Sequence, residues 1–485
     1  MDQHAAHGVT TPQAGAQASW SDWYRPAVTV AILAGLCAGL LAMPTPEGLS
    51  VAGQRVLAVA VMGIGLWSTD VLPPGLTGML VVVLLVLLRG VPTLREALTG
   101  FAHPVAYFLM GVLTIGLAVL KSGLAERVAC FFLQRSRGRP RALYLQMLLA
   151  FPLLTFILPS ATTRTGILIH VYDQALELSR VPRGAPLAKA IMLALNSVNR
   201  LASTVLLTGG ITPITAAALI GGISWTRWLV LMWLPYYAML AIASGMIYGL
   251  YRRGFGPVLS VPPMAAQRAL SGKELRTIII TMGASLLWLT DALHHWNPAL
   301  PALMAWMCLL APGIGVLSWS DFERQLGWAN LFVLASSLSL AQALVASGAA
   351  DWLAGLLVWA TPGSAQQPLL VVAVLLLAAA PVRLLVPNIT GFLAITIPIA
   401  MSVGTASGLN PVVCGLLMMI AGDAVLYYPA QSASSLVVYE RGHLSAPEIF
   451  RFGLWMTLVA YVVVLLIALP YWAAVGEPLV IRSAE

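Results

Sequence analysis

The sequence predicts an all-α polytopic membrane protein, with about 11 transmembrane helices and two re-entrant hairpins arranged in two inverted-topology repeats. Three observations lead to this fold class. Hydrophobic residues make up 59% of the 485 positions and charged residues only 9%, whereas soluble domains carry about 25% charged residues. Two polar islands interrupt apolar stretches at corresponding places in the two halves, and short motifs recur in the same order in each half.

Apolar stretches of spanning length supply the predicted crossings, because a helix needs about 20 apolar residues to cross a bilayer. They fall near residues 27–43, 54–72, 74–91, 104–121, 187–221, 227–250, 275–293, 299–317, 329–346, 411–437 and 451–474. The chain starts with polar residues and lacks a basic region ahead of the first apolar run. We therefore expect residues 1–26 to form a cytoplasmic N-terminal tail rather than a cleaved signal.

The first polar island is the segment 158–166, with the sequence LPSATTRTG, between apolar arms at 142–157 and 167–178. Each arm is shorter than the about 20 residues of a spanning helix, so the segment 141–179 is predicted to be a re-entrant hairpin. Backbone leaves the helix at membrane depth only where protein or a water-filled cavity surrounds it. A proline and several hydroxyl residues at this tip therefore indicate a cavity.

The second polar island is the segment 383–391, with the sequence RLLVPNITG, and it predicts a second hairpin over 368–404. Basic residues flank the first hairpin and fill the segment 251–274, which places both on the cytoplasmic side by the positive-inside rule. The flanks of the second hairpin, 347–367 and 404–411, contain no Lys or Arg. We expect that side to be external.

An internal repeat relates the two halves. The motif LWSTD at 66–70 recurs as LWLTD at 287–291, and SGLA at 122–125 recurs as SGAA at 347–350. An odd number of crossings separates the copies if the hairpin does not span, so the second copy is inverted. We predict a first repeat with its preceding helix at 27–250, a cytoplasmic linker rich in Gly and Pro at 251–274, and a second, inverted repeat at 275–485.

Each hairpin is followed by a membrane segment that is broken in its middle. The segment 187–221 is interrupted at 203–213, and the segment 411–437 is interrupted at 421–432. Unwound helices expose carbonyls to a cation and N-terminal amides to an anion, so a hairpin tip and a break together predict an ion-sized site in each half. The alternative is that these Gly, Ser and Thr residues only let helices pack closely.

Three ionisable residues near the islands are candidates for function. An intramembrane arginine such as Arg164 is a functional hypothesis by default, here contact with an anion, with an ion pair to Asp423 as the alternative. Asp423 itself could ligate sodium or carry a proton, or cap a helix. His170 could titrate near neutrality, or be a packing residue.

The order of helices, the paired hairpins and the segment VYERGHLS at 438–445 resemble the divalent anion:sodium symporter family of the ion transporter superfamily, over nearly the whole chain from about residue 27. That family has a Ser-Asn-Thr motif at each hairpin tip, which contacts sodium and a carboxylate substrate. Ser160-Ala161-Thr162 and Asn388-Ile389-Thr390 occupy these places, with Ala161 and Ile389 where the family usually has Asn. Thr212-Pro213 keeps the family's Thr-Pro in the broken helix, and Tyr428-Pro429 keeps half of it.

The resemblance and the polar islands together give the candidate site. Candidate substrate-binding residues are Ser160, Thr162, Thr163, Arg164, Asn388, Thr390, Thr212, Pro213 and Pro429. Candidate sodium ligands, through backbone or side chain, are Ser160, Ala161, Thr208, Gly209, Gly210, Asn388, Ile389 and Asp423. Asp423 and His170 are the possible proton sites.

The expected function is secondary active symport of small anions, mainly di- or tricarboxylates, coupled to sodium or protons. The resemblance implies an elevator-type movement and a homodimer, in the plasma (inner) membrane. The alternative is an ion antiporter of the same superfamily, for arsenite efflux or sodium/proton exchange. We expect no cofactor besides a coupling sodium ion. The sequence lacks HExxH, GxSxG and GxxxxGK[ST] motifs, so an enzyme or a primary pump is not expected. The net charge of +8 sits mainly in loops and does not indicate nucleic acid.

Overall fold

The computed structural model describes residues 20–158, 160–256, 269–360 and 367–481, and these ranges are almost entirely helical. The one extended pairing among them is an isolated bridge between Leu409 and Val480. The predicted all-α fold class is confirmed. Most of the predicted N-terminal tail, Pro159 of the first island and half of the predicted linker 251–274 lie outside the described residues.

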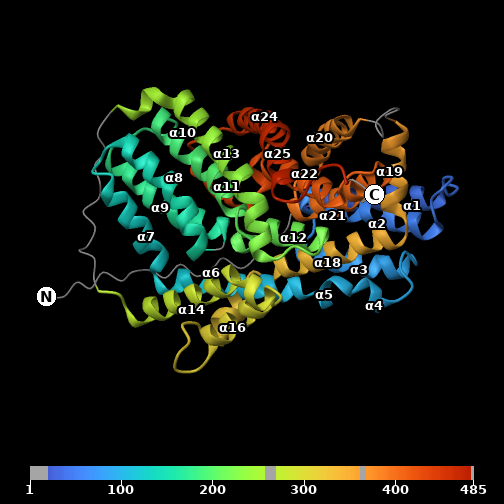
Figure 1. Ribbon diagram of the computed structural model, residues 1–485, viewed down its shortest axis with the longest axis horizontal. Coiled ribbons are helices and arrows are strands. Elements are labelled where there is room, and N and C mark those ends of the chain that lie inside the picture. The colour runs from blue at the N-terminus through green and yellow to red at the C-terminus, as the bar shows by residue number, and fades with distance from the viewer. Residues whose placement is uncertain (1–19, 159, 257–268, 361–366, 482–485) are drawn as a thin grey trace.

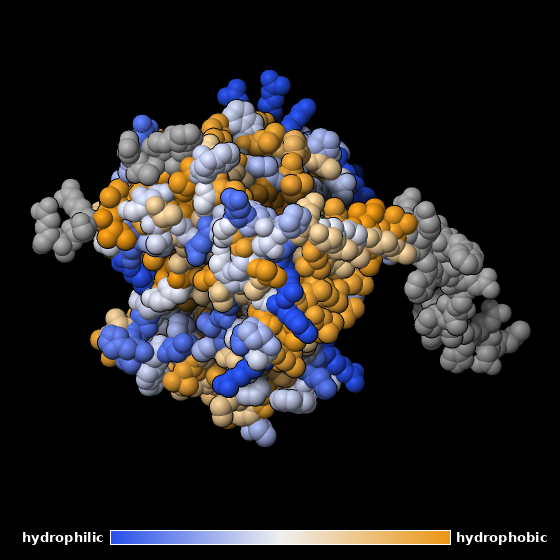
Figure 2. Space-filling view, turned by 90° about the vertical axis from the view of Figure 1, so that its right-hand side faces the viewer, coloured by the Kyte–Doolittle hydropathy of each residue, from blue (hydrophilic) through white to orange (hydrophobic). Residues whose placement is uncertain are grey.

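The chain is a multi-pass membrane protein with helices of two lengths. Those long and apolar enough to span a bilayer are Val51–Thr69, Pro104–Ser122, Trp225–Phe255, Trp328–Ala346, Pro368–Leu385, Ile389–Ala406 and Ala446–Ala474. Shorter apolar helices are Pro26–Ala42, Pro74–Leu87, Pro140–Phe156, Ile211–Ile220, Ala299–Leu310, Ala349–Trp359 and Pro411–Asp423. Figure 2 shows a broad apolar area on one side of the molecule, with strongly hydrophilic residues towards its upper and lower margins.

One layer of the molecule, along the lower side of Figure 1, is built from helices of both repeats. It contains α2 (Val51–Thr69), α3 (Pro74–Leu87), α4 (Leu94–Ala97), α5 (Thr99–Ala102), α6 (Pro104–Ser122), α14 (Gly272–Leu289), α15 (Asp291–His294), α16 (Ala299–Leu310), α17 (Trp319–Gln325) and α18 (Trp328–Ala346), with α1 (Trp20–Ala42) against α2. Helix α3 packs on α18, and α16 packs on α6. In each pair a helix of one repeat packs on a helix of the other repeat. The two pairs are therefore equivalent, as a pseudo-two-fold arrangement requires. We call this layer the scaffold.

The second layer contains the two hairpins, the two broken helices and the helices that pack on them (Figure 1). From the first repeat it has α7 (Leu124–Arg135), α8 (Pro140–Ile157), α9 (Ala161–Leu178), α10 (Pro186–Leu193), the π-helical turn η1 (Ala194–Val198), α11 (Asn199–Thr204), α12 (Ile211–Ile220) and α13 (Trp225–Tyr251). From the second it has α19 (Ala349–Trp359), α20 (Pro368–Leu385), α21 (Ile389–Ala406), α22 (Pro411–Asp423), α23 (Ala433–Tyr439), α24 (Ala446–Val463) and α25 (Leu469–Ala474).

The repeated LWxTD motif has the same local structure in both halves. The indole N–H of Trp67 donates to the carbonyl of Pro74 at 3.1 Å, and that of Trp288 donates to the carbonyl of Pro298 at 3.0 Å. The threonine hydroxyl of each motif, Thr69 or Thr290, bonds the carbonyl four residues before it at 2.8 Å. The sequence repeat is therefore also a structural repeat at this place.

The two predicted hairpins are present as helix–turn–helix units, α8–α9 and α20–α21. Each arm has 18 residues, and the second arm of each hairpin is longer than its apolar run, because the polar residues after the tip continue the helix. At 1.5 Å per residue an arm is about 27 Å long. Arm length alone therefore does not establish re-entry of the hairpins, which stays a prediction that rests on the charge of their flanks.

Cysteine labelling tests the topology of the first hairpin. In a chain whose native cysteines are replaced, we expect Arg139→Cys and Arg183→Cys both to be protected from an impermeant maleimide on intact cells, because both exposed positions lie in basic, cytoplasmic flanks. The matched control is Thr405→Cys, at an exposed position in the external flank of the second hairpin, which we expect to react. Labelling of one of the first two positions but not the other would show that the segment spans the membrane.

Candidate functional site

The second arm of each hairpin packs against the broken helix of the other repeat. Helix α9 contacts α23, and α21 contacts α12. The tip residues Ser160 and Asn388 begin these arms as N-caps: the Ser160 hydroxyl accepts from the N–H of Thr163 at 3.2 Å, and the side-chain oxygen Oδ1 of Asn388 accepts from the N–H of Thr390 at 2.9 Å. The polar islands of the two repeats thus lie in one layer, at the starts of helices whose N-terminal ends favour negative charge.

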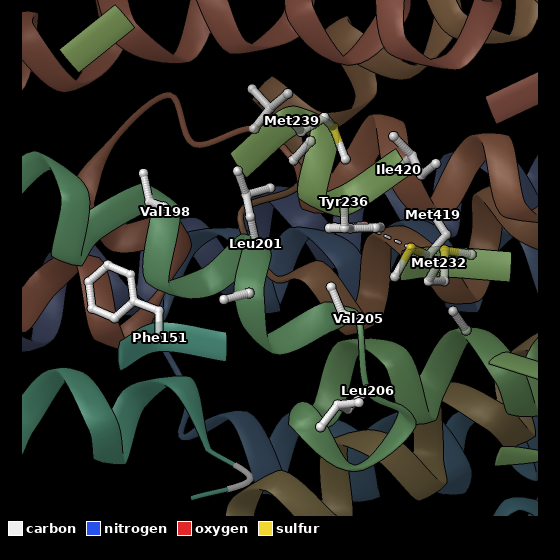
Figure 3. Packing of buried hydrophobic residues seen from close by; sticks show 14 of the residues in the cluster. Phe151, Val198, Leu201, Val205, Leu206, Met232, Tyr236, Met239, Met419 and Ile420 are labelled. Carbon is white, nitrogen blue, oxygen red and sulfur yellow. Dashed lines mark hydrogen bonds between the residues drawn. The ribbon is translucent and has the colours of Figure 1, made fainter. Parts of the chain in front are cut away.

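The first broken helix runs through α10, η1 and α11 and restarts as α12 after the segment 205–210. Gly209 is required in the break, because a Cβ there would lie 1.7 Å from the carbonyl oxygen of Ser203. The indole of Trp228 donates to the carbonyl of Thr204 at 3.0 Å and satisfies an oxygen that the helix leaves unpaired. Figure 3 shows Leu201 and Val205 of the first broken helix packed towards α13 and α22.

The second broken helix ends α22 at Asp423, passes through a short 3-10 turn at Pro429–Gln431, and restarts as α23. Gln431 ties the break to the second hairpin. Its side-chain oxygen accepts from the N–H of Tyr427 at 2.7 Å, and its amide donates to the carbonyl of Arg383 at 2.8 Å. The Tyr428 hydroxyl donates to the carbonyl of Leu384 at 3.1 Å.

Arg164 joins the first hairpin tip to the first broken helix and is fully buried. Its Nη1 donates to the carbonyl of Leu158 at the tip at 2.5 Å, and its Nε donates to Oδ1 of Asn199 at 2.9 Å. Its Nη2 donates to the carbonyl of Asn199 at 3.2 Å and to the Ser203 hydroxyl. All these acceptors are neutral, and the expected alternative, an ion pair between Arg164 and Asp423, is not the arrangement found.

Arg383 joins the second hairpin tip to the second broken helix and is also fully buried. Its Nη1 donates to the carbonyls of Val386 and Pro387 at the second tip at 2.7 and 2.8 Å, and its Nε donates to the carbonyl of Gly422 in the broken helix at 2.9 Å. Its Nη2 has no hydrogen-bond partner in the described part of the chain. A buried guanidinium nitrogen without a partner marks a place where an acceptor is missing.

Asp423 connects the two broken helices to each other. Arg200, at the start of α11, places Nη1 3.4 Å from Oδ1 of Asp423 and donates from Nη2 to the Asp423 carbonyl. The hydroxyls of Thr204 and Tyr236 donate to Oδ2 of Asp423 at 2.7 and 3.2 Å. Only 1% of the Asp423 side chain and 10% of the Arg200 side chain are exposed. Three buried guanidinium groups and one buried carboxylate therefore hold the tips and breaks together, with an excess of two positive charges.

The other predicted site residues differ in how far they are exposed. Thr162 is exposed. The half-buried residues are Ala161, Thr163, Gly210, Thr212, Ile389 and Pro429, and the buried residues are Thr208, Gly209, Pro213 and Thr390. His170 lies in the middle of α9, exposed, with a ring nitrogen 3.2 Å from Nη2 of Arg441. Its partner is thus a residue beyond the end of α23 rather than a tip or break residue.

Several residues that organise this region were not among the predicted site residues. Asn199 and Arg200 precede the first break, and Tyr236 comes from α13. Ser203 and Gln431 lie inside the predicted breaks 203–213 and 421–432, but neither was a predicted site residue. One signal was available: Arg200 is an arginine inside an apolar segment, as conspicuous as Arg164. Tyr236 carried no such signal, because its role depends on how α13 packs against α22 (Figure 3).

Comparisons with known proteins identify the family of this chain. The family model described as the sodium:sulfate symporter transmembrane region matches residues 21–477. The citrate/succinate antiporter of Escherichia coli is 24% identical over 78% of this chain and 81% of its own. The chloroplastic dicarboxylate transporter 2 of Spinacia oleracea is 21% identical over 92% of this chain and 82% of its own.

Among solved structures, the YdaH transporter of Alcanivorax borkumensis aligns with a TM-score of 0.49 and 16% identity, over 94% of this chain and 98% of that one. The family match covers nearly all of the described residues and confirms the resemblance to divalent anion:sodium symporters. The chain therefore belongs to the sodium:sulfate symporter family and is a membrane transporter, not an enzyme.

Proposed function

We propose that this protein carries small di- or tricarboxylate anions across the plasma (inner) membrane. The observation that carries the proposal is the excess of two buried positive charges in the layer formed by the hairpin tips and broken helices, contributed by Arg164, Arg200 and Arg383 against Asp423. Buried charge is costly in a membrane unless it is paired, so this layer is suited to a ligand with two negative charges. The names of two relatives, a citrate/succinate antiporter and a dicarboxylate transporter, support the same class of substrate.

The groups that would contact the anion are hydrogen-bond donors near the tips that have no acceptor within the described ranges. Ser160 and Asn388 use an oxygen to cap a helix, and neither the Ser160 hydroxyl nor the Asn388 amide donates a hydrogen bond in the described ranges. Arg383 adds a buried Nη2 without a partner. A carboxylate accepts such bonds well, and charge-assisted bonds are about twice as strong as neutral ones. Thr162, Thr390 and Thr212 stay proposed contacts on the grounds of the family motifs, and Thr163 stays one as their neighbour at the first tip.

Transport then requires this layer to move against the scaffold as one body, in the elevator-type mode that the family resemblance implies. Arg164 ties the first hairpin to the first broken helix, Arg383 and Gln431 tie the second hairpin to the second, and Asp423 joins the two broken helices. Helices α12 and α21 contact α18 of the scaffold, which is the surface across which the body would slide. We further propose a homodimer and a cytoplasmic N-terminus, both as the sequence predicts.

The alternative function, exchange of sodium for protons, is less well supported by this arrangement. A cation carrier needs an excess of buried acidic groups, whereas Asp423 is the one buried carboxylate among the described residues of the tips and breaks, and it is already paired with Arg200. An arsenite carrier would handle a neutral or singly charged species and would leave part of the positive charge unbalanced.

Uptake by purified protein in proteoliposomes tests the proposed substrate class. We expect saturable uptake of labelled succinate, competition by malate and citrate, and no competition by the monoanion lactate, because a single carboxylate balances one of the two positive charges. Vesicles without protein provide the background. Transport of sodium, protons or arsenite, without transport of any carboxylate, would contradict the proposal.

Loss of the Asp423 carboxylate should destabilise the layer that contains the hairpins and the broken helices. Asp423→Asn leaves Arg200 buried without a counter-charge, and breaking a buried pair from one side costs about 3–5 kcal/mol. The matched control is Glu477→Gln, which removes the charged partner of Arg227. The side chains of that pair are 33% (Arg227) and 22% (Glu477) exposed. Losing such a partly exposed pair is expected to cost about 0–1 kcal/mol of stability. Thermal unfolding in detergent should therefore show a much larger fall in Tm for Asp423→Asn. Equal shifts in the two variants would mean that the buried pair contributes little to stability.

A further inference from the structure

A groove lies between α8 and α13, and Arg141 stands at one end of it. We propose that this groove binds an anionic phospholipid, with one acyl chain along its apolar walls and the phosphate at Arg141. The groove ends at Leu148, about 15 Å along α8 before the first hairpin tip. The inference is independent of the proposed transport function, because it uses no residue of the hairpin tips or the broken helices.

The walls of the groove are mainly apolar and come from both helices. They enclose a cavity of about 360 Å³, lined by Tyr144, Leu145 and Leu148 of α8 and by Ala241, Gly245 and Tyr248 of α13. At 1.5 Å per residue, the lining stretches 141–148 and 241–248 are each about 10 Å long. Helix α13 is part of a segment long and apolar enough to span a bilayer. Its exposed apolar side chains are therefore expected to face acyl chains.

The floor of the groove is closed, but the space above it is open. The Tyr144 hydroxyl donates to the carbonyl of Ser244 at 3.0 Å, and both residues are buried. Next to Ser244, Gly245 is exposed, and a Cβ placed on it would meet no atom within 4 Å. The two helices are thus joined at the floor and leave room above it for a chain of methylene groups.

Three aromatic rings meet at one end of the groove. Phe255, in the 3-10 turn η3 (Arg252–Phe255), has its ring centroid 5.3 Å from that of Tyr144 and 5.0 Å from that of Tyr248. Tyrosine is enriched where membrane helices cross the level of the lipid headgroups. We therefore expect this end of the groove at headgroup level and the opposite end, at Leu148 and Ala241, among the acyl chains.

Positive charge gathers at the aromatic end of the groove. Arg141 lies one turn before Tyr144, in the first turn of α8, and the exposed Arg252 and Arg253 belong to the same short turn as Phe255. Among the described residues, none of these three arginines forms an ion pair, and neither the first turn of α8 nor that of η3 contains an acidic residue. Basic pockets between membrane helices suit the headgroups of anionic lipids. The charge therefore favours an anionic lipid over a zwitterionic one.

Lipid binding to the purified, delipidated protein in a neutral detergent tests the proposal. By native mass spectrometry, dioleoylphosphatidylglycerol should bind at least about tenfold more tightly than dioleoylphosphatidylcholine, because each basic residue near the headgroup favours the anionic lipid by about fivefold. It should also raise the Tm at concentrations where the zwitterionic lipid does not. Glycerol 3-phosphate, which has a phosphate but no acyl chain, should leave the Tm unchanged. Equal binding of the two lipids, or an equal effect of glycerol 3-phosphate, would overturn the inference.

Filling the groove locates the lipid. Gly245→Phe places a ring in the open space without a clash at its Cβ, and should weaken binding of the anionic lipid at least about tenfold by excluding the acyl chain. The matched control is Gly355→Phe, at an exposed glycine of α19 where a Cβ also meets nothing within 4 Å. If Gly245→Phe binds the lipid as tightly as Gly355→Phe, the groove is not the site.

Removing the charge at the end of the groove tests the place of the phosphate. Arg141→Gln should weaken binding of the anionic lipid about fivefold and leave that of the zwitterionic lipid unchanged. Arg95→Gln removes a charge at an exposed position of α4 and should behave like the parent chain. An equal preference for the anionic lipid in the two variants would show that Arg141 does not contact the phosphate.

A second copy of the chain is the other occupant that the groove could accept. Light scattering during size-exclusion chromatography decides between the two occupants. The lipid proposal requires Gly245→Phe and the parent chain to have the same mass. If Gly245→Phe instead turns a dimer into a monomer, the groove is an interface between copies and the lipid proposal is wrong. If Gly245→Phe fails to fold, the comparison of the two lipids on the parent chain and on Arg141→Gln still decides.

Discussion

Asp423 is the buried charged group that links the two broken helices of this protein to each other. It ends α22, accepts hydroxyl bonds from Thr204 and Tyr236, and faces the guanidinium of Arg200. A carboxylate at membrane depth is tolerated only with such a full set of partners. Because the partners come from the other broken helix and from α13, the pairing requirement of one residue brings segments of both repeats into one body.

The arginines extend this constraint to the hairpins. The predicted re-entry of the hairpins puts each tip inside the membrane region, where an unpaired carbonyl cannot turn to water. Arg164 satisfies the first tip and Arg383 the second, and each also bonds the adjoining broken helix. The same contacts that make the tips possible accumulate positive charge around them. The proposed site for a dianion is thus linked directly to the way in which the backbone is stabilised.

Most of the fold followed from the sequence. Composition and periodicity identified a polytopic helical protein, and the hairpins lie within two residues of their predicted bounds, 140–178 and 368–406 against 141–179 and 368–404. The helix breaks were found because Gly, Pro and hydroxyl residues interrupt apolar runs, which is a local signal. The arm lengths were underestimated, since Ser160 and Asn388 are N-caps and the polar residues after them are helical. A hydropathy pattern cannot distinguish a capped first turn from a loop.

The sequence by itself determined the class of protein, the positions of the four islands and the presence of Arg164 and Asp423 within them. Only the tertiary structure decided that Asp423 pairs with Arg200 rather than with Arg164, and that Arg383 bonds the second tip. The reason is physical: hydropathy, helix breaks and repeats are properties of neighbouring residues, whereas the partner of a buried charge is set by which helices meet. Arg200 and Asp423 are 223 positions apart, and nothing in either segment alone specifies the contact.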